Sequence, residues 1–459
     1  MLHRAQSWHE RCGSFAGCNG AGRDPVWAET FMNPNSLARW RSLFLAVVLI
    51  TLCAPLVRGS QVNYVVHVSL DGLGAKYLQF YVTNAPAQFP WFNWLITNGA
   101  STFNARCDYD VSETVPNHIT MFTGRPVAQP LGMPNTVHHG YPSNFPSPNA
   151  IIHTHGNPNV PYKASFFDVA HDFGRSTAFY ASKTRLQICN QSYDVANGAP
   201  GIEGADHGQD KIDFASVVDL SGANVSNLVN TLVLNLSSST PTNYSFIHIA
   251  EPDLTGHSFG WGSANWSNSV RNVDAQLGRI INCLLTNTLL IDDTALIVSA
   301  DHGGSGTSHT TATLLTNYTI PFFLWSPATP ANRDVYSLFA NRGNPGTNRV
   351  DWAAIPQPVR NADGGNLALS LLGLPPIPGS FAVPIFGATN VTMNVARATN
   401  GSHTIWWPAA ANAFVLEFAS SLGTPISWQT ISNGVINTGG MLTYSVTNLG
   451  TQFYRLRKL

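Results

Sequence analysis

Residues 295–309, with the sequence ALIVSADHGGSGTSH, dominate the interpretation of this chain. The apolar, β-branched start predicts a buried strand, and Asp301 and His302 follow it directly. Glycines come next, and then His309. α/β proteins place metal ligands at the carboxyl edge of a sheet with this kind of strand end and flexible backbone. An Asp-His pair alone also fits a capped loop, so the rest of the chain must decide between the two.

The composition fits one large α/β domain with a smaller one attached. The chain has 459 residues, of which 44% are hydrophobic, enough for a sizeable core. Only 11% are charged and the formal net charge is −1. Because no basic stripe is present, we expect no binding to a nucleic-acid duplex.

Residues 1–60 have the pattern of a leader. Residues 43–52 (LFLAVVLITL) are apolar and follow Arg39 and Arg41. This block is short for a membrane span and predicts a secretory signal peptide, with no stable span after cleavage. It lies far from Met1, so the true start is expected at Met32. The protein is then secreted or periplasmic, with an uncleaved anchor as the alternative.

Strands and helices alternate over residues 61–384. Strands are predicted at residues 62–70, 104–110, 176–181, 244–249 and 295–299. Helices are predicted at residues 91–98, 165–173, 227–236 and 267–287, and a long loop at residues 126–162. This alternation predicts an α/β fold with a mostly parallel sheet covered on both faces. Residues 385–399 are predicted to be a linker, and residues 400–459, with several short strand patterns, a small β-sandwich-like all-β domain.

Metal-ligating side chains recur at the predicted strand ends. Four such segments meeting at one sheet edge would form two metal sites, and two metals about 4 Å apart can clamp the attacking and leaving oxygens of a displacement at phosphorus. A threonine hydroxyl beside a metal loses its proton more readily and becomes a nucleophile. These ligand types suit two Zn²⁺, or less selectively Mn²⁺ or Fe. The segments contain Asp71; Thr114; Asp253 and His257; and Asp301, His302 and His309.

Together, these motifs resemble the alkaline phosphatase superfamily, and most closely its type I phosphodiesterase/nucleotide pyrophosphatase family. The resemblance covers about residues 62–380. It implies an alkaline-phosphatase-like three-layer α/β/α sandwich and an enzyme that hydrolyses phosphate esters. The motifs that carry it are Asp71-Gly72, Thr114-x-Pro116-Asn117-His118, Asp253-x-x-x-His257 and Asp301-His302-Gly303.

The resemblance also implies roles for single residues. Thr114 would be the nucleophile and would form a phosphothreonine that water then hydrolyses. One zinc would be held by Asp71, Thr114, Asp301 and His302, and the other by Asp253, His257 and His309.

Three further residues are candidates for contacts with the substrate. Residues 139–144 (HGYPSN) resemble a family segment whose asparagine holds a phosphoryl oxygen, which implies this role for Asn144. Asn135 is the competitor, because the loop is longer here. Lys183 follows a predicted strand and is expected either to reach a substrate anion or to be an ordinary surface lysine.

Two departures limit the substrate assignment. His309 follows His302 by only seven residues, whereas the last zinc histidine of nucleotide pyrophosphatases lies far downstream. The early position resembles phosphoethanolamine transferases and sulfatase-like relatives, which weakens the case for nucleotide specificity. The motif that sulfatases convert to formylglycine is missing at residues 114–118, which argues against sulfatase activity.

We therefore predict a secreted two-zinc phosphodiesterase that acts on a small phosphate ester or a lipid head group. Diesters are favoured over monoesters because Thr114 is flanked by Glu113 and Val115, without a positive charge. A phosphomonoesterase or a phosphoethanolamine-type transferase is the alternative. In an alternative of another class, the core is inactive and residues 400–459 bind a surface partner, whose identity is open. A metal-dependent mutase fits less well, because such enzymes usually use serine and work in the cytoplasm.

Overall fold

The computed structural model describes residues 61–200, 208–219 and 225–384 of the main α/β region. In the C-terminal region it describes residues 393–397, 403–408, 414–423, 426–438, 441–446 and 450–458. The predicted leader, with Met32 and the signal peptide, and most of the predicted linker lie outside these ranges. Those assignments, and the domain boundaries drawn from them, stay predictions.

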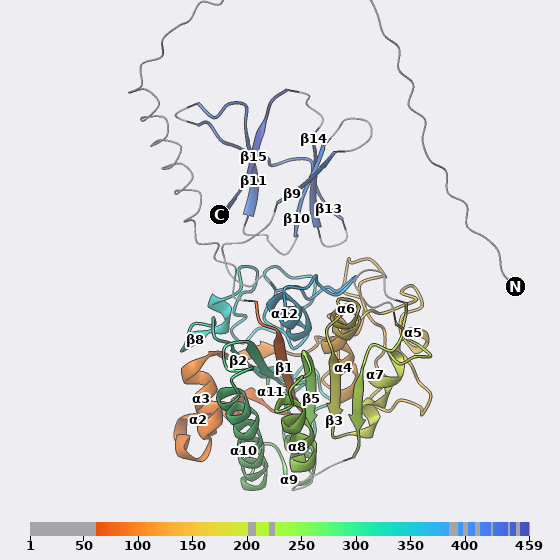
Figure 1. Cartoon of the computed structure of the whole chain (residues 1–459), viewed down its shortest axis with the longest axis vertical. Coiled ribbons are helices and arrows are strands. Elements are labelled where there is room, and N and C mark those ends of the chain that lie inside the picture. Colours follow the sequence, from red (N-terminus) through yellow and green to blue (C-terminus); the bar gives the residue numbers. More distant parts are fainter. Residues whose placement is uncertain are drawn as a thin grey trace, which may run out of the picture. The chain divides into compact units, whose positions relative to one another are not determined.

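The core of the α/β region is an eight-stranded sheet with the order β4-β3-β5-β1-β6-β7-β2-β8 (Figure 1). Neighbouring strands are parallel, except that β7 runs antiparallel to both β6 and β2. The predicted mostly parallel sheet is confirmed. The strands are β1 (Tyr64–Leu70), β2 (Ala100–Arg106), β3 (Thr177–Ala181), β4 (Phe214–Val217), β5 (Tyr244–Ile249), β6 (Thr294–Ser299), β7 (Thr319–Trp325) and β8 (Arg333–Asp334).

The strand predicted at residues 104–110 was placed too late. β2 begins at Ala100 and ends at Arg106. The chain then turns, because the Asp108 carboxylate accepts hydrogen bonds from the backbone N–H groups of Asp110 (2.8 Å) and Val111 (3.2 Å). A short acidic side chain that bonds the backbone two residues ahead favours a turn over a continued strand.

Helices form the two outer layers of the sandwich. One group packs on strands from β3 to β2 and includes α8 and α10, which lie side by side (Figure 1). The other packs on β1, β3 and β6. The first comprises α2 (Ala75–Asn84), α3 (Pro90–Asn98), α8 (Val225–Leu236) and α10 (Ala264–Thr286), and the second α4 (Thr114–Thr123), α6 (Phe166–Asp172) and α12 (Asp363–Leu371). The remaining described helices are η1 (Pro86–Gln88), α5 (Ile152–His155), η2 (Thr184–Leu186), α7 (Gln187–Ser192), α9 (Glu251–Phe259), α11 (Leu315–Tyr318) and η4 (Val335–Ser337).

Local sequence explains the long helix α10. The Ser263 hydroxyl accepts a hydrogen bond from the backbone N–H of Trp266, which caps the first turn. Apolar residues recur three and four positions apart and form one buried stripe. The stripe contains Trp266, Val270, Val273, Leu277, Ile280, Ile281 and Leu284.

Asp274 of α10 joins two helices of this layer. Its carboxylate accepts hydrogen bonds from the backbone N–H groups of Trp91 (3.1 Å) and Phe92 (2.8 Å), which lie in the first turn of α3. These donors have no partner within their own helix. Burial raises the pKa of Asp274 to about 6, and the two N–H groups offset this only in part.

Asp274→Asn should therefore change how stability depends on pH. Asparagine keeps an acceptor for the α3 amides but cannot ionise. Since the folded-state pKa lies above the unfolded value, wild type loses stability as pH rises from about 4 to about 6. Relative to wild type, the free energy of unfolding of the variant should rise by about 1–3 kcal/mol across this window. Above pH 7 this difference should change little further. Thermal unfolding of metal-free protein from pH 4.5 to 7.5 measures it, and a pH-independent difference would contradict the prediction.

The described C-terminal residues form two antiparallel sheets, with the orders β13-β14-β10-β9 and β12-β11-β15. One apolar cluster takes Ile405, Trp407 and Val446 from the first sheet and Leu416 from the second. The prediction of a small all-β region is confirmed. The strands are β9 (Asn394–Arg397), β10 (His403–Pro408), β11 (Phe414–Ala419), β12 (Gln429–Thr430), β13 (Val435–Thr438), β14 (Met441–Val446) and β15 (Phe453–Lys458).

Within the described ranges, none of the helices combines the length and the apolar character needed to cross a bilayer.

Candidate active site

The central strands bring the predicted ligands together at one edge of the sheet. β3, β5, β1 and β6 are consecutive neighbours and parallel, so their carboxyl ends lie side by side. Asp71 directly follows β1, and Asp301 follows β6 by two residues. Asp253 lies in the first turn of α9, which begins after β5, and Lys183 follows β3. This edge is where open α/β sheets bind their ligands.

Two buried clusters at this edge could each hold a metal ion. One contains Asp71, Asp301 and His302, and the other Asp253, His302 and His309, with the ligand atoms of each cluster within 4.8 Å of one another. His302 is common to both, so the clusters are contiguous.

Among the described residues, three buried atoms in these clusters have no hydrogen-bond partner. They are Oδ1 of Asp253, Oδ2 of Asp301 and Nε2 of His302. A buried polar atom without a partner is costly, and a cation in each cluster would offset this cost. The donor set of carboxylate and imidazole therefore fits a divalent metal such as zinc.

Each metal-facing aspartate divides its two oxygens between different partners. Oδ1 of Asp71 lies 3.5 Å from both Thr114 Oγ1 and His302 Nε2. Oδ1 of Asp253 lies 3.4 Å from His257 Nε2 and 3.5 Å from His309 Nε2. The Oδ2 atoms face away from these ligands, toward Lys183 Nζ, at 2.6 Å in both cases.

Backbone carbonyls orient the histidines. The Nδ1 atoms of His302, His309 and His257 lie 2.8, 2.6 and 3.0 Å from the carbonyl oxygens of Gly303, Ser112 and Thr307. A proton on Nδ1 leaves Nε2 as the lone-pair donor, which is how metal-binding histidines are usually fixed. His257 Nε2 is 3.2 Å from His309 Nε2, and because His257 is exposed it marks the open side of the site.

Burial sets the charge of the ligands. It lowers the pKa of His309 to about 3, with His302 adding to the effect, so His309 is neutral near pH 7. Burial would raise the pKa of Asp71, but Lys183 and His248 outweigh it and hold that pKa well below its usual range. Asp301 behaves oppositely, because burial and the Asp71 charge raise its pKa well above its usual value. A cation beside Asp301 would favour its ionised form.

Thr114 is the first residue of α4 and is fully buried beside the first cluster. The positive end of the helix dipole favours negative charge at this position. His118, one turn further, has Nδ1 at 2.7 Å from the Thr114 carbonyl oxygen and Nε2 at 2.9 Å from Ser69 Oγ. His118 thus ties the first turn of α4 to β1.

The structure separates the two candidate asparagines. The Asn144 side chain is 7% exposed, and its Oδ1 accepts a hydrogen bond of 2.9 Å from the backbone N–H of Val115, next to Thr114. Asn135 is exposed, and its backbone carbonyl accepts a hydrogen bond from Asn157 Nδ2. The geometry thus brings Asn144, and not Asn135, to the Thr114 turn.

Sequence reasoning missed several residues that support the site. His248 is buried, and its Nε2 contacts Asp71 Oδ2 at 2.9 Å. Trp261 donates a hydrogen bond of 2.7 Å from Nε1 to the Gly72 carbonyl oxygen and packs against the His257 and His309 rings. The position of His248 near the end of a strand beside β1 was the one signal that could have identified it.

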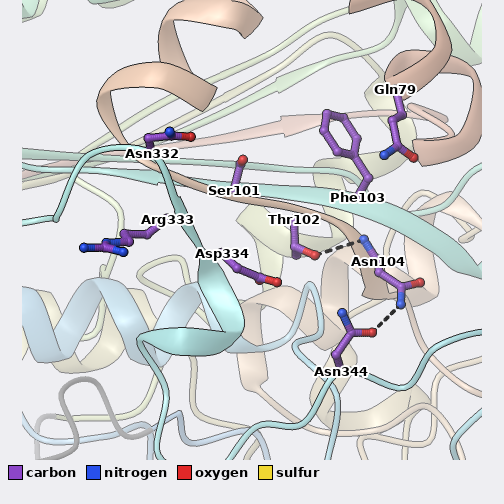
Figure 2. A pocket seen from close by; sticks show the side chains of 9 residues that line it. All are labelled: Gln79, Ser101, Thr102, Phe103, Asn104, Asn332, Arg333, Asp334 and Asn344. Carbon is purple, nitrogen blue, oxygen red and sulfur yellow. Dashed lines mark hydrogen bonds between the residues drawn. The ribbon is translucent and has the colours of Figure 1, made fainter. Parts of the chain in front are cut away.

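A separate hollow of about 460 Å³ lies along β2 (Figure 2). Its walls are mostly polar, and Asn104 bonds to Asn344 there at 2.6 Å. None of the predicted site residues lines this hollow. It offers neither the imidazoles nor the carboxylate cluster of the metal-fitting edge.

The geometry agrees with a comparison to known families. Residues 65–321, more than half of the chain, match the model of the type I phosphodiesterase/nucleotide pyrophosphatase family. The chain belongs to this family. The match spans β1 to β7 and includes all seven predicted metal ligands.

Individual relatives are more distant. A venom phosphodiesterase of Naja atra is 33% identical over 102 residues, which is 22% of this chain and 12% of that enzyme's length. Murine ectonucleotide pyrophosphatase/phosphodiesterase 5, solved as an inactive variant with AMP, is 15% identical, with a TM-score of 0.46 and coverage of 71% of this chain and 97% of that one. An alkaline phosphatase superfamily protein of Vibrio parahaemolyticus is 13% identical, covers 75% of each chain and has a TM-score of 0.44.

Gly72 offers a test of how closely the two clusters are packed. It has a φ of +68°, and a Cβ there would lie 2.8 Å from the Asp253 Cα. Gly72→Ala should therefore push α9 away and weaken zinc binding at least tenfold, with a loss of about 2–4 kcal/mol of stability. Zinc titration and thermal unfolding measure these effects.

Gly132→Ala is the matched control, because Gly132 has a φ of +75° but nothing within 4 Å of the added Cβ. It should cost about 1 kcal/mol from backbone strain and leave zinc binding unchanged. Equal effects of the two substitutions on zinc binding would contradict the packing argument.

Proposed function

We propose that this protein is a zinc-dependent phosphodiesterase in which Thr114 is the nucleophile. The observation that carries the proposal is the position of its hydroxyl. Thr114 Oγ1 is buried at the start of α4 and lies 3.5 Å from the Asp71 oxygen that faces the first metal-fitting cluster. Family membership supports the same reaction class.

Two groups of side chains would hold two zinc ions. Asp71, Thr114, Asp301 and His302 would hold one, and Asp253, His257 and His309 the other. Bound zinc would supply Lewis-acid chemistry, which lowers the pKa of a hydroxyl or water and offsets charge on the phosphoryl oxygens.

The chain's residues supply the rest of the displacement. The Thr114 hydroxyl loses its proton to solvent as its oxygen forms a bond to phosphorus, the ester bond to the leaving oxygen breaks, and that oxygen takes a proton from solvent. Water then attacks the phosphothreonine and loses a proton to solvent, the threonine–phosphorus bond breaks, and the Thr114 oxygen takes a proton from solvent. The α4 N-terminus favours the negative charge that develops beside it.

Asn144 would bind one non-bridging phosphoryl oxygen. Its Oδ1 is engaged by the Val115 N–H, which fixes the plane of the amide. No hydrogen bond holds Asn144 Nδ2 among the residues that the structure describes, so this donor can meet the substrate.

The charges around Thr114 favour a diester. Monoesters carry one more negative charge and need a cation beside the nucleophile. Arg125, the first arginine after Thr114 along the chain, donates hydrogen bonds from its guanidinium to the backbone carbonyls of Thr136 (2.7 Å) and Pro378 (3.3 Å). Lys183 is already paired with two carboxylates. The substrate class is a small phosphate ester or a lipid head group, and export by the predicted leader would place the reaction outside the cytoplasm.

Hydrolysis of model esters tests this function. With added zinc, the full-length protein should cleave bis-p-nitrophenyl phosphate faster than p-nitrophenyl phosphate. The Thr114→Ala substitution, or the addition of a chelator, should lower the rate of hydrolysis at least 10³-fold. A monoester preference would overturn the charge argument. Bound zinc without cleavage would favour a transferase, and the absence of both would favour the binding-protein alternative.

A pair of asparagine variants tests the phosphoryl contact. Asn144→Ala should lower kcat for the diester about 10²–10³-fold, because one donor to the developing charge is lost. Asn135→Ala, on the exposed part of the same loop, should change kcat less than twofold. Equal effects, or the reverse order, would show that Asn135 holds the substrate.

A further inference from the structure

Lys183 occupies a position that neither a surface lysine nor a simple substrate contact explains. Its side chain is 8% exposed, and the residue follows the strand β3, two places from β1 in the sheet. Its Nζ lies 2.6 Å from Asp71 Oδ2 and 2.6 Å from Asp253 Oδ2. One ammonium group thus bridges carboxylates that belong to different metal-fitting clusters.

In each of the two aspartates, the two carboxylate oxygens face different partners, and Lys183 contacts one of them. In both aspartates, Oδ1 faces the histidines and Thr114, and Oδ2 faces Lys183. A carboxylate with one oxygen fixed by a cation keeps its other oxygen in a fixed direction. His248 contributes a second contact to Asp71 Oδ2, whereas the side chain that contacts Asp253 Oδ2 is Lys183.

The surroundings of Nζ leave little room for a substrate contact. Both contacts are short, charge-assisted and buried, so moving the ammonium toward a substrate would leave Asp253 Oδ2 without this partner and Asp71 Oδ2 with His248 alone. Removing one partner of a buried ion pair is strongly unfavourable.

We infer that Lys183 is a positioning residue that ties the two metal sites together by holding the non-ligating oxygens of Asp71 and Asp253. This inference rests on the proposed two-metal function. It replaces the expectation that Lys183 contacts the substrate, and it makes the affinity of either site depend on a residue that touches neither metal.

Zinc binding by variants of the full-length protein tests the inference. In Lys183→Met, zinc affinity should fall 10–100-fold at both sites, the range typical of lost partners of metal ligands. Competition with a chromogenic chelator gives the two dissociation constants, and elemental analysis gives zinc per chain. Lys183→Gln can still hydrogen bond but carries no charge, so its zinc affinity should fall between those of Lys183→Met and wild type. If Lys183→Met does not fold, Lys183→Gln takes its place in the test.

Lys211→Met is the matched control. Lys211 is also buried and ion-paired, with its Nζ 2.5 Å from Asp172 Oδ1, but it contacts none of the metal-facing residues. Its loss should lower the Tm and leave both zinc dissociation constants within twofold of wild type. This control separates a general loss of stability from a specific loss of metal affinity.

Two results would overturn the inference. Zinc affinity within twofold of wild type in Lys183→Met, with a raised KM for the diester, would make Lys183 a substrate contact. A loss confined to one site would show that Lys183 does not couple the two. Failure of wild type to bind zinc would instead refute the proposed function, so the two failures can be told apart.

Discussion

The structure depends on the burial of three carboxylates, Asp71, Asp253 and Asp301, at one edge of a parallel sheet. Their charges are expensive to remove from water and must be met by cations or protons. Lys183 pairs with Asp71 and Asp253, and burial together with the Asp71 charge raises the pKa of Asp301. The unpaired ligand atoms of the two clusters remain suited to a cation.

Much of the surrounding chain serves to hold this edge in place. The loop that carries Asn144 is anchored by Lys163, whose buried ammonium donates to the backbone carbonyls of His153, Asn157 and Val160 at 2.7–2.8 Å. Two further hydrogen bonds join Ser112 and His309. The Ser112 hydroxyl donates to the His309 carbonyl oxygen at 2.5 Å, and His309 Nδ1 lies 2.6 Å from the Ser112 carbonyl oxygen. A long polar loop is therefore ordered by local bonds to its own backbone, which explains how it can position a side chain for catalysis.

A tight backbone turn accounts for the short separation between His302 and His309 in the sequence. His309 reaches the Asp253 cluster because the backbone turns sharply at residues 303–308, where Ser305 and Ser308 bond each other's backbone. Cβ atoms on Gly303 and Gly304 would lie 2.1 Å from the Thr316 carbonyl oxygen and 2.2 Å from the Trp261 ring. A compact turn thus brings His309 to the site only seven residues after His302, where its ring packs against Trp261.

The sequence alone determined the fold class and the family, and it predicted a ligand set of which the structure brings Asp71, Asp253, Asp301, His302 and His309 into two clusters. Alternating buried strands and amphipathic helices permit few topologies, and Asp71, Asp253 and Asp301 each follow a strand whose carboxyl end must lie at one edge. The tertiary structure decided which side chains meet across strands. It places Asn144, and not Asn135, beside the Thr114 turn. It also brings Lys183 into contact with Asp71 and Asp253, and His248 into contact with Asp71. These contacts join residues up to 177 positions apart, and their geometry follows from strand order and packing, which local sequence patterns do not encode.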